Sequence, residues 1–313
     1  MNDQPTDRDA RARLTVAISG AGGLVGTALK RSLLADGHRV VRLVRRPAKP
    51  LADESGVIEC QWSTSDGIVD KSAVEGITAF VHLAGENLAG GRWTKPRRKR
   101  IRDSRILGTR NVVDSLGELE RPPAAFICAS AIGYYGDRGR EELVESSSPG
   151  EGFLAEICID WEEEARKAEA FTRSVQARFG IILSPDGGAL DKMLTPFRFG
   201  VGGRLGDGRQ FMSWVTLPDV VSALHHAIDA ELSGPMNVTA PEPVTNGDFT
   251  RELAAALSRP AILPVPATAL RLALGDMADE ALLASTRALP GVLQTSGFEF
   301  AHSDLRSGLA AIL

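Results

Sequence analysis

The chain has 313 residues, of which 43% are apolar and 24% charged, and its formal net charge is −4 at pH 7. These values exclude a disordered or fibrous protein, and the length allows about two domains or one large α/β domain with an appendage. Three cysteines without CxxC spacing and five scattered histidines predict reduced thiols, a reducing cytoplasmic location and no bound metal. The longest stretch free of Asp, Glu, Lys and Arg is 16 residues, from Leu14 to Leu29, too short for a membrane span.

Residues 1–13 mix Asp and Arg without an apolar core, which predicts a disordered tail and not a signal peptide. From Leu14 onward, short β-rich runs alternate with patterns typical of helices, and each crossover in such a chain must return over the sheet. We therefore expect an α/β fold, a doubly wound parallel sheet of the Rossmann type. In chain order, the predicted elements are a strand over Leu14–Ser19, a helix over Gly23–Ala35, strands over Arg39–Val44, Val57–Trp62 and Ala79–Leu83, a helix over about Lys95–Leu116, a strand over Ala124–Ala129, a helix over about Phe153–Ala170 and a strand over Ser174–Arg178.

The second half of the chain is less regular. The stretch from Ser184 to Trp214 is dense in glycine, which predicts a flexible loop on the substrate side. Three prolines between positions 260 and 266 mark a boundary, and the segment after them is mostly typical of amphipathic helix. We expect a nucleotide-binding Rossmann domain over residues 14–258 and a smaller C-terminal helical domain over 259–313.

A glycine-rich segment directly follows the first strand and opens the first helix, with the sequence Gly20-Ala21-Gly22-Gly23-Leu24-Val25-Gly26. Gly20 allows a tight turn, Gly23 lets backbone approach a pyrophosphate, and Gly26 lets helix and strand pack closely. The free N–H groups at the helix start, which includes Leu24 and Val25, would then hold the phosphates. The alternative is a plain glycine-rich turn, but the order of strand, glycines and helix favours dinucleotide binding.

The end of the second strand distinguishes between the two nicotinamide cofactors. NAD-binding proteins usually place an acid there for the ribose 2′-hydroxyl, whereas this chain has Val44, Arg45 and Arg46. Guanidinium groups suit the extra 2′-phosphate of NADP, so we expect NADP(H) as the cofactor, with these three residues among those that bind it. The alternative is two solvated arginines at the end of a strand.

The GxxGxxG spacing resembles the short-chain dehydrogenase/reductase superfamily, specifically its extended, nucleotide-sugar-epimerase-like branch. Further motifs are similar to that branch, and by this resemblance Leu83, Ala84 and Gly85 flank the adenosine of the cofactor. The matching segments are His82–Gly85, Gly108–Asn111, Ser130 with Tyr135-Gly136, Phe211–Val221 and Gly234–Val238.

Within that branch, the chain is identified as a member of the atypical, NAD-dependent epimerase/dehydratase-like "epimerase family protein" group, which carries a C-terminal domain of unknown function. This likeness implies an NADP(H)-binding oxidoreductase or nucleotide-sugar-epimerase-like enzyme that acts on an unidentified small molecule. The resemblance covers about residues 14–313 and rests on the segments Ala84–Asn87, Arg92–Thr94, Ser104-Arg105, Ser130–Gly136, Phe197-Arg198, Gly202-Gly203, Trp214, Leu270–Leu272 and Gly297-Phe298.

The usual chemistry of the superfamily depends on a Tyr-x-x-x-Lys pair, in which the lysine lowers the tyrosine pKa and holds the ribose, while a serine or threonine orients the substrate oxygen. Neither of the chain's two tyrosines is followed four residues later by lysine. By the resemblance, Leu154 and Cys158 occupy the positions of the Tyr and the Lys, and Ala131 occupies that of the Ser or Thr. Hydride transfer would therefore need another proton donor, and the alternative is a non-catalytic NADP(H)-binding sensor or scaffold.

Few side chains are available as a replacement donor. Ser130 lies at the carboxyl end of a predicted strand, where ligands bind in open α/β sheets, and Tyr134 would donate a proton if an arginine lowered its pKa. We therefore predict Ser130 and Tyr134 as the catalytic residues. Glu86 as a base and Tyr135 as a donor are alternatives, although Glu86 also fits a loop cap or ribose ligand and Tyr135 a packing role in its turn.

A run of eight basic residues and one acid spans Arg92 to Arg105. By the resemblance, this run crosses the region where the family helix faces the cofactor, so we expect Arg100 and Arg105 to reach a cofactor phosphate or an anionic substrate. The alternatives are a solvated helix face and a nucleic-acid surface. We expect no nucleic-acid partner because the chain is acidic overall and residues 141–169 hold ten acids against two bases. By analogy with related folds, we consider a homodimer through the helices near 95–116 and 153–170.

Overall fold

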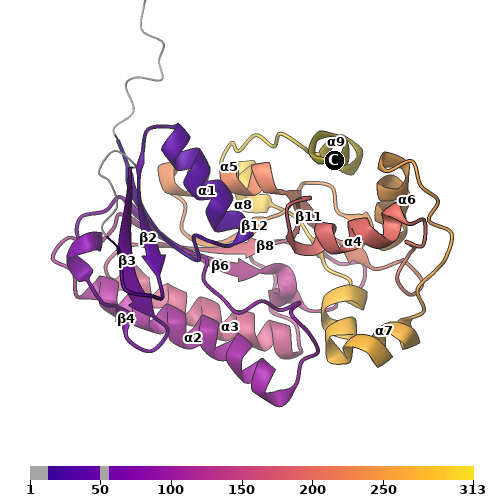
Figure 1. Cartoon of the computed structure of the whole chain (residues 1–313), viewed down its shortest axis with the longest axis horizontal. Coiled ribbons are helices and arrows are strands. Elements are labelled where there is room, and N and C mark those ends of the chain that lie inside the picture. Colours follow the sequence, from indigo (N-terminus) through magenta and orange to yellow (C-terminus); the bar gives the residue numbers. More distant parts are fainter. Residues whose placement is uncertain (1–12, 50–55) are drawn as a thin grey trace, which may run out of the picture.

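The computed structural model describes residues 13–49 and 56–313, so the tail expected over residues 1–13 lies outside the described residues apart from its last position. The main strands are β1 (Thr15–Ser19), β2 (Arg39–Val44), β3 (Val57–Ser63), β4 (Gly67–Ile68), β5 (Ala79–His82), β6 (Ala125–Ala131), β8 (Arg173–Phe179) and β12 (Gly234–Val238). They form one sheet in the order β12-β8-β6-β5-β1-β2-β3-β4 (Figure 1). Neighbours from β12 to β3 are parallel, whereas β4 pairs antiparallel with β3. This order confirms the predicted doubly wound parallel sheet.

Helices cover both faces of this sheet (Figure 1). On one face α1 (Leu24–Ala35) packs against α5 (Leu217–Asp229), and on the other α2 (Lys95–Gly117) packs against α3 (Phe153–Arg166). Because both faces are covered, the central strands are almost continuously apolar. Phe80 in the middle of β5, for example, is fully buried.

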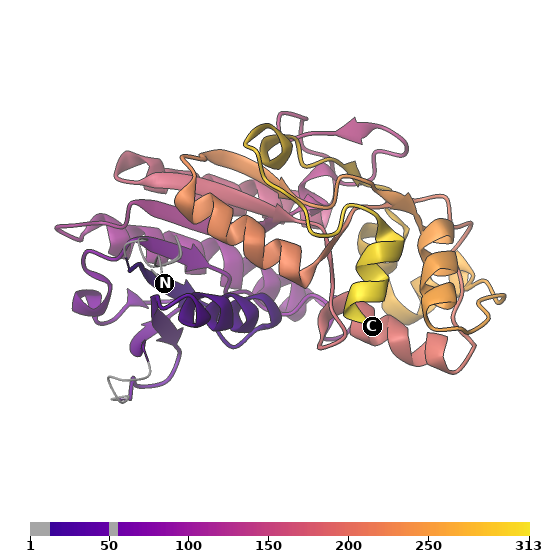
Figure 2. The ribbon, with the colours of Figure 1, turned by 90° about the horizontal axis from the view of Figure 1, so that it is seen from above.

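A second lobe follows β8 in the chain and is built largely from α4 (Gly188–Arg198), α6 (Asn246–Ala256) and α9 (Leu305–Ile312). Its core includes Trp214 and Phe249, both of which are buried. Helix α9, at the C-terminus, lies against α6 (Figure 2). The short strands of this region are β9 (Ile181–Leu183), β10 (Phe211–Met212), β11 (Trp214–Thr216) and β13 (Val244–Thr245).

Helix α4 occupies the first half of the glycine-dense stretch, so the prediction of a flexible loop between Ser184 and Trp214 is wrong there. Leu190, Leu194 and Phe197 are buried along one face of α4, with the spacing of an amphipathic helix. The glycines that suggested a loop lie at the start of this helix and in the irregular segment that follows it. Their density therefore marks the ends of a helix and the connection after it.

The C-terminal segment is less helical than its amphipathic pattern predicts. Extended backbone separates its helices, and β14 (Arg287–Ala288) pairs with β7 (Glu142–Leu143) from the middle of the chain. None of the described helices is both long and apolar enough to span a membrane. The remaining helical elements are α7 (Ala267–Leu274), the π-helical turn η5 (Ala278–Leu283), α8 (Gly291–Thr295), and the 3₁₀ turns η2 (Lys71–Val74), η3 (Ile132–Tyr135) and η4 (Lys167–Ala170).

His82 is a buried polar residue at the carboxyl end of β5. Its Nδ1 lies 2.7 Å from Ser19 Oγ, and its Nε2 has no hydrogen-bond partner in the described structure. The ring packs edge-on against Trp62 at a centroid distance of 5.8 Å and stacks on Phe126. Burial among these aromatic rings lowers the pKa of His82 to about 4, because the charged imidazolium would lose its hydration there.

We expect His82 to make the folded state sensitive to mild acid. The folded chain keeps the imidazole neutral down to about pH 4, while the unfolded chain takes up a proton near pH 6.5. Stability from this group is therefore complete above pH 6.5 and is lost as the pH falls toward 4, by about 2 kcal/mol at pH 5. Urea unfolding at pH 7 and pH 5 should show a smaller acid loss for His82→Gln than for the wild type. His38→Gln, at a half-buried histidine, is the control and should keep the wild-type difference.

Candidate cofactor and substrate site

The glycine-rich loop after β1 is built around close backbone contacts. Gly20 has φ +69°, and a Cβ there would lie 2.8 Å from the Leu83 carbonyl and 2.9 Å from the Ala84 nitrogen. A Cβ on Gly26 would lie 2.4 Å from the Gly20 carbonyl oxygen. Only glycine fits at both positions, because any side chain would separate the loop from β5 or the helix from the loop.

At the start of α1, the loop leaves backbone N–H groups without hydrogen-bond acceptors in the described structure. The helix has no side-chain cap and no acid in its first turn. Gly23 N–H donates back to Gly20, and the first regular helical bond runs from Thr27 to Gly23, so the amides of Leu24 and Val25 have no backbone acceptor within the described residues. Exposed amides and the positive end of the helix dipole are suited to bind an anion such as a pyrophosphate.

The carboxyl ends of β1 and β5 are held together by Ser19. Its Oγ accepts hydrogen bonds from Leu83 N–H at 3.1 Å and Ala84 N–H at 3.3 Å. The same hydroxyl contacts His82, so the predicted segment from Leu83 to Gly85 is fixed against the glycine loop. A ligand on the loop would therefore meet a preformed second wall.

The end of β2 carries more positive than negative charge. Arg46 donates to both carboxylate oxygens of Glu59, at 2.6 and 2.7 Å, and Arg42 contacts the same carboxylate. These bonds from Arg46 and Arg42 lower the pKa of Glu59 to about 2, so it stays ionised. Arg45, which follows Val44, is exposed and forms no hydrogen bond or ion pair with any described residue. Two guanidinium groups share the Glu59 carboxylate and Arg45 pairs with no described residue, which leaves an excess of cationic charge around the end of β2.

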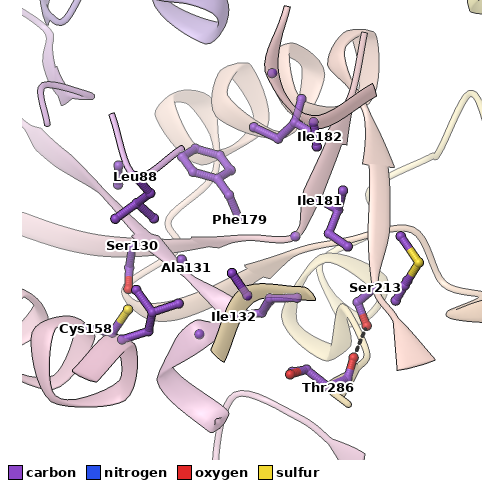
Figure 3. Close-up of a pocket in the computed structure, with 18 of the residues that line it drawn as sticks. Leu88, Ser130, Ala131, Ile132, Cys158, Phe179, Ile181, Ile182, Ser213 and Thr286 are labelled. Atoms are coloured by element: carbon purple, nitrogen blue, oxygen red, sulfur yellow. Dashed lines mark hydrogen bonds between the residues drawn. The ribbon is translucent and has the colours of Figure 1, made fainter. Parts of the chain in front are cut away.

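A cavity of about 550 Å³ lies between the carboxyl ends of the sheet strands and the second lobe. At one end it is lined by Gly20, Gly23 to Gly26 and Leu83. Its floor includes Ser130 and Ala131 from the end of β6, with Leu154 and Cys158 from α3 (Figure 3). The opposite wall comes from β9, α4, β10 and the C-terminal segment, including Ile181, Ile182, Met193, Leu205, Phe211, Met212, Ser213, Asn246, Glu280, Leu282 and Thr286.

The three positions that the resemblance assigns to the superfamily relay, Ala131, Leu154 and Cys158, all line this cavity. Leu154 and Ala131 offer no titratable group there. Burial raises the pKa of the Cys158 thiol to about 12, so the thiol is neutral and unreactive near pH 7. Its sulfur lies beside the Ser130 hydroxyl (Figure 3). By the resemblance, this neutral thiol occupies the position of the superfamily's lysine.

Ser130 is held by a buried charged pair. Its Oγ donates to Glu162 Oε1 at 2.7 Å, and Glu162 receives two further bonds of 2.7 Å from Arg178 Nε and Nη2. The side chains of Glu162 and Arg178 are only 1% and 2% exposed. The bidentate pair therefore sits inside the protein and fixes the rotamer of Ser130 at the cavity floor.

The two tyrosines lie behind this pair and not in the cavity wall. The Arg178 guanidinium lies 3.6 Å from the Tyr134 ring centroid, and Arg178 Nη1 donates to Tyr135 Oη at 2.9 Å. The Tyr135 hydroxyl also lies 2.8 Å from Asn237 Oδ1. Burial raises the pKa of Tyr135 to about 12, even with Arg178 beside it. The structure thus brings Ser130 to the cavity but does not bring Tyr134 there, and both catalytic assignments stay predictions.

The two arginines predicted from the basic run have different surroundings. Arg105 lines the cavity, where its Nη1 donates to the carbonyls of Glu86 and Ile101 and its guanidinium faces the Trp161 ring. It forms no ion pair with a described residue. Arg100 is more than half exposed, lies 3.9 Å from Glu86 and does not line the cavity. The structure therefore places one of the two at the candidate site.

The rest of the basic run is largely paired within the chain. Arg102 contacts Asp160 of α3, and Arg98 contacts Asp276 of the C-terminal segment. Lys99 pairs with Asp103 one turn along α2. These contacts reduce the excess charge on α2, and the absence of a nucleic-acid partner stays a prediction. Among the described residues, no group of three or more His, Cys, Asp or Glu is placed to hold a metal ion.

Sequence reasoning missed two carboxylates that build the site. One is Glu59, which pairs with Arg46 at the end of β2. The other is Glu280 of the C-terminal segment, which accepts the Leu154 N–H at the start of α3, at 2.8 Å. Glu59 lies in a strand, a signal that such a charge needs a partner. Glu280 carried no local signal, because its partner is 126 positions away.

The fold and the site together define a dinucleotide-binding protein. On the side of the second lobe, its cavity is bounded by a mainly apolar wall. The chain matches the NAD dependent epimerase/dehydratase family over residues 16–239 and a domain of unknown function (DUF1731) over residues 265–312. The chain therefore belongs to the NAD-dependent epimerase/dehydratase family.

Known proteins resemble the chain over almost its whole length. It is 43% identical to the epimerase family protein Mb2239 of Mycobacterium bovis, across 95% of this chain and 97% of that one. The crystal structure of the human epimerase family protein SDR39U1 (isoform 2) with NADPH is 31% identical, has a TM-score of 0.85, and is matched across 96% of this chain and 99% of the human one. A nucleoside-diphosphate sugar epimerase from Corynebacterium glutamicum is 35% identical with a TM-score of 0.78, across 96% of this chain and 58% of that one.

We expect the buried pair to dominate the stability of this region. Glu162→Ala leaves Arg178 charged, buried and without its partner, so the free energy of unfolding should fall by about 3–5 kcal/mol. Equilibrium urea unfolding measures the change. Glu163→Ala, at the exposed neighbouring position, is the control and should change stability by less than about 0.5 kcal/mol. A double variant, Glu162→Ala with Arg178→Met, should be less destabilised than Glu162→Ala; an equal or larger loss would contradict this account.

Proposed function

We propose that the chain is an NADP(H)-dependent oxidoreductase with an atypical proton donor, in the short-chain dehydrogenase/reductase superfamily. The observation that carries this proposal is the continuous surface from the glycine loop to Ser130: unpaired amides at the start of α1, the fixed Leu83–Ala84 wall, and the cavity floor. The complex of the similar human protein with NADPH supports the choice of cofactor.

The residues present fit the cofactor. The close packing of Gly20 and Gly26 leaves the pyrophosphate side of the loop free of side chains, and Gly22 faces open space. At the end of β2, Arg45 and the exposed part of Arg46 would hold the 2′-phosphate of NADP(H). Leu83, Ala84 and Gly85 would flank the adenosine.

The chain's own groups would act on the substrate oxygen. When bound, NADP(H) supplies or accepts a hydride. In the direction of reduction, a carbonyl substrate gains that hydride at carbon and a proton at oxygen, which gives an alcohol and the oxidised cofactor. With a substrate bound, the Ser130 O–H would turn from Glu162 to the substrate oxygen, donate a hydrogen bond to it and pass it the proton, which Ser130 regains from solvent. The Arg105 guanidinium would stabilise the negative charge that develops on that oxygen.

A second function, NADP(H) binding without catalysis, is favoured by one specific observation. The positions of the usual Tyr and Lys hold Leu154 and Cys158, and Ser130 is itself a weak acid. A sensor or scaffold needs the cofactor cradle and no proton donor. Both functions predict that the chain binds NADP(H), and only the oxidoreductase function predicts turnover of a substrate. The reducing, cytoplasmic location stays a prediction, consistent with three free and buried cysteines.

We expect Arg45→Ala to weaken NADPH binding and leave NADH binding nearly unchanged. Loss of one charge-assisted contact to a phosphate corresponds to about a 10- to 100-fold increase in the Kd for NADPH. Cofactor fluorescence titration measures both constants. Arg39→Ala, an exposed arginine at the other end of β2, is the matched control. Equal losses for the two cofactors would contradict a role of Arg45 at the 2′-phosphate.

We expect Ser130→Ala to slow hydride transfer by about 100-fold or more, because the substrate oxygen loses its proton-transfer partner. The decrease in the near-ultraviolet absorbance of NADPH, followed across a panel of carbonyl compounds and nucleotide sugars, measures turnover. The Kd for NADPH should not change, and the exposed Ser148→Ala should behave as wild type. If wild-type protein binds NADPH and turns over no member of the panel, the binding-only function is favoured.

A further inference from the structure

The cavity wall opposite the glycine loop is mainly apolar. It is formed by Ile181, Ile182, Met193, Leu205, Phe211 and Leu282, which come from β9, α4, the loop after it, β10 and η5. Ile181 and Ile182 project into the space beside Phe179 (Figure 3). Removing such surfaces from water with an apolar ligand is favourable, at about 25 cal/mol per Å² buried.

The polar side chains on this wall already have partners within the protein. Ser213 Oγ donates toward the carbonyls of Thr286 and Ala288, at 2.9 and 3.0 Å, and accepts the Ala288 N–H at 2.8 Å. Asn246 Oδ1 accepts the Leu205 N–H at 2.7 Å, and its amide contacts the Met212 sulfur. Neither side chain has its full hydrogen-bonding capacity left for a ligand.

The same holds for the polar residues supplied by the C-terminal segment. Thr286 Oγ1 donates to the Gly136 carbonyl at 2.9 Å, and Glu280 accepts the Leu154 N–H at 2.8 Å. This wall therefore offers few free donors and acceptors to a ligand rich in hydroxyl groups, so some polar groups of such a ligand would be buried without partners. Each unpaired group costs about 1–3 kcal/mol.

The charged groups that line the cavity also favour an apolar ligand over a nucleoside diphosphate. Arg105 is the only Lys or Arg among the described residues that line the cavity, and Glu280 is its only carboxylate there. A nucleoside diphosphate carries two phosphate groups and needs several cationic or N–H donors. The amides of α1 that would meet phosphates lie at the opposite end, where the cofactor is proposed to bind.

Building on the proposed function, we infer that the substrate site takes a largely apolar carbonyl compound, or the corresponding alcohol, and not a nucleotide sugar. Its carbonyl oxygen faces Ser130 and Arg105, and its apolar body lies against the wall from Ile181 to Leu282. The C-terminal segment, through η5 and the residues after it, thereby forms part of the substrate wall.

Isothermal titration calorimetry on the full chain tests this inference. Binding of NADP⁺ is measured first; the loaded protein is then titrated with benzylacetone, cyclohexanone and decanal, and separately with UDP-glucose and UDP-glucuronic acid. We expect at least one apolar carbonyl probe to bind and neither nucleotide sugar to compete with it. Absence of NADP⁺ binding would contradict the proposed function itself, whereas NADP⁺ binding followed by tight binding of a nucleotide sugar, or by no binding of any apolar probe, would overturn the inference.

Two substitutions at Ala281 test whether the carbonyl probe binds against the apolar wall. Ala281 lines the cavity but is exposed, so the fold tolerates its replacement. Ala281→Trp fills the space and Ala281→Asp adds a charge, and each should weaken probe binding by about tenfold or more while leaving the Kd for NADP⁺ unchanged. Leu272→Trp, on α7 and 80% exposed, is the matched control and should bind as wild type. Unchanged probe binding in both Ala281 variants would show that the apolar wall is not the site and would overturn the inference.

Discussion

The buried pair of Glu162 and Arg178 is the interaction around which the candidate site is arranged. It joins β8 to α3, fixes the Ser130 hydroxyl on one side and orients the two tyrosines on the other. Two charges inside a protein are stable only when each is fully paired, and here the carboxylate accepts three hydrogen bonds while the guanidinium also donates to Tyr135 and to the Glu145 carbonyl. The cost of burying this pair between β8 and α3 is offset by these hydrogen bonds, which also set the position of the Ser130 hydroxyl on the cavity floor.

This arrangement differs from the Tyr-x-x-x-Lys relay that is usual in the superfamily. In the superfamily, one helix supplies both the acid and the cation that supports it. Here Leu154 and Cys158 of α3 line the cavity, and the Glu162 carboxylate of the same helix pairs with Arg178 of the sheet strand β8. The cationic group beside the substrate space comes instead from α2, as Arg105, which lies on the other side of Trp161. A hydroxyl, Ser130 from β6, and a positive charge, Arg105 from α2, thus line the same cavity and come from different elements.

The sequence allowed the doubly wound parallel sheet, the glycine loop and the place of Ser130 at the carboxyl end of a strand to be predicted, because each depends on local periodicity or on fixed spacing along the chain. It did not allow the partners of the charges to be predicted. Glu59 and Arg46 lie 13 positions apart on neighbouring strands, and Glu280 and Leu154 lie 126 apart. Helix α4 was not predicted because glycines precede and follow it closely, although its buried Leu190, Leu194 and Phe197 keep a helical period. Tertiary contacts of this kind have no signature in a single sequence.

The hydrogen bond from Leu154 N–H to Glu280 has a mechanical consequence. Glu280 caps the first turn of α3 and also belongs to the cavity wall, while Leu154 and Cys158 of α3 line the facing side. The two walls are therefore joined at this bond, in addition to the packing of Leu274 and Met277 against Ile157 of α3. Displacing the C-terminal segment from the cavity would release an amide at the start of α3, and fraying of that helix end would loosen the segment in return. Motion on either side is coupled to the other, so the amide of Leu154 reports locally, through its rate of hydrogen exchange, how often the cavity opens.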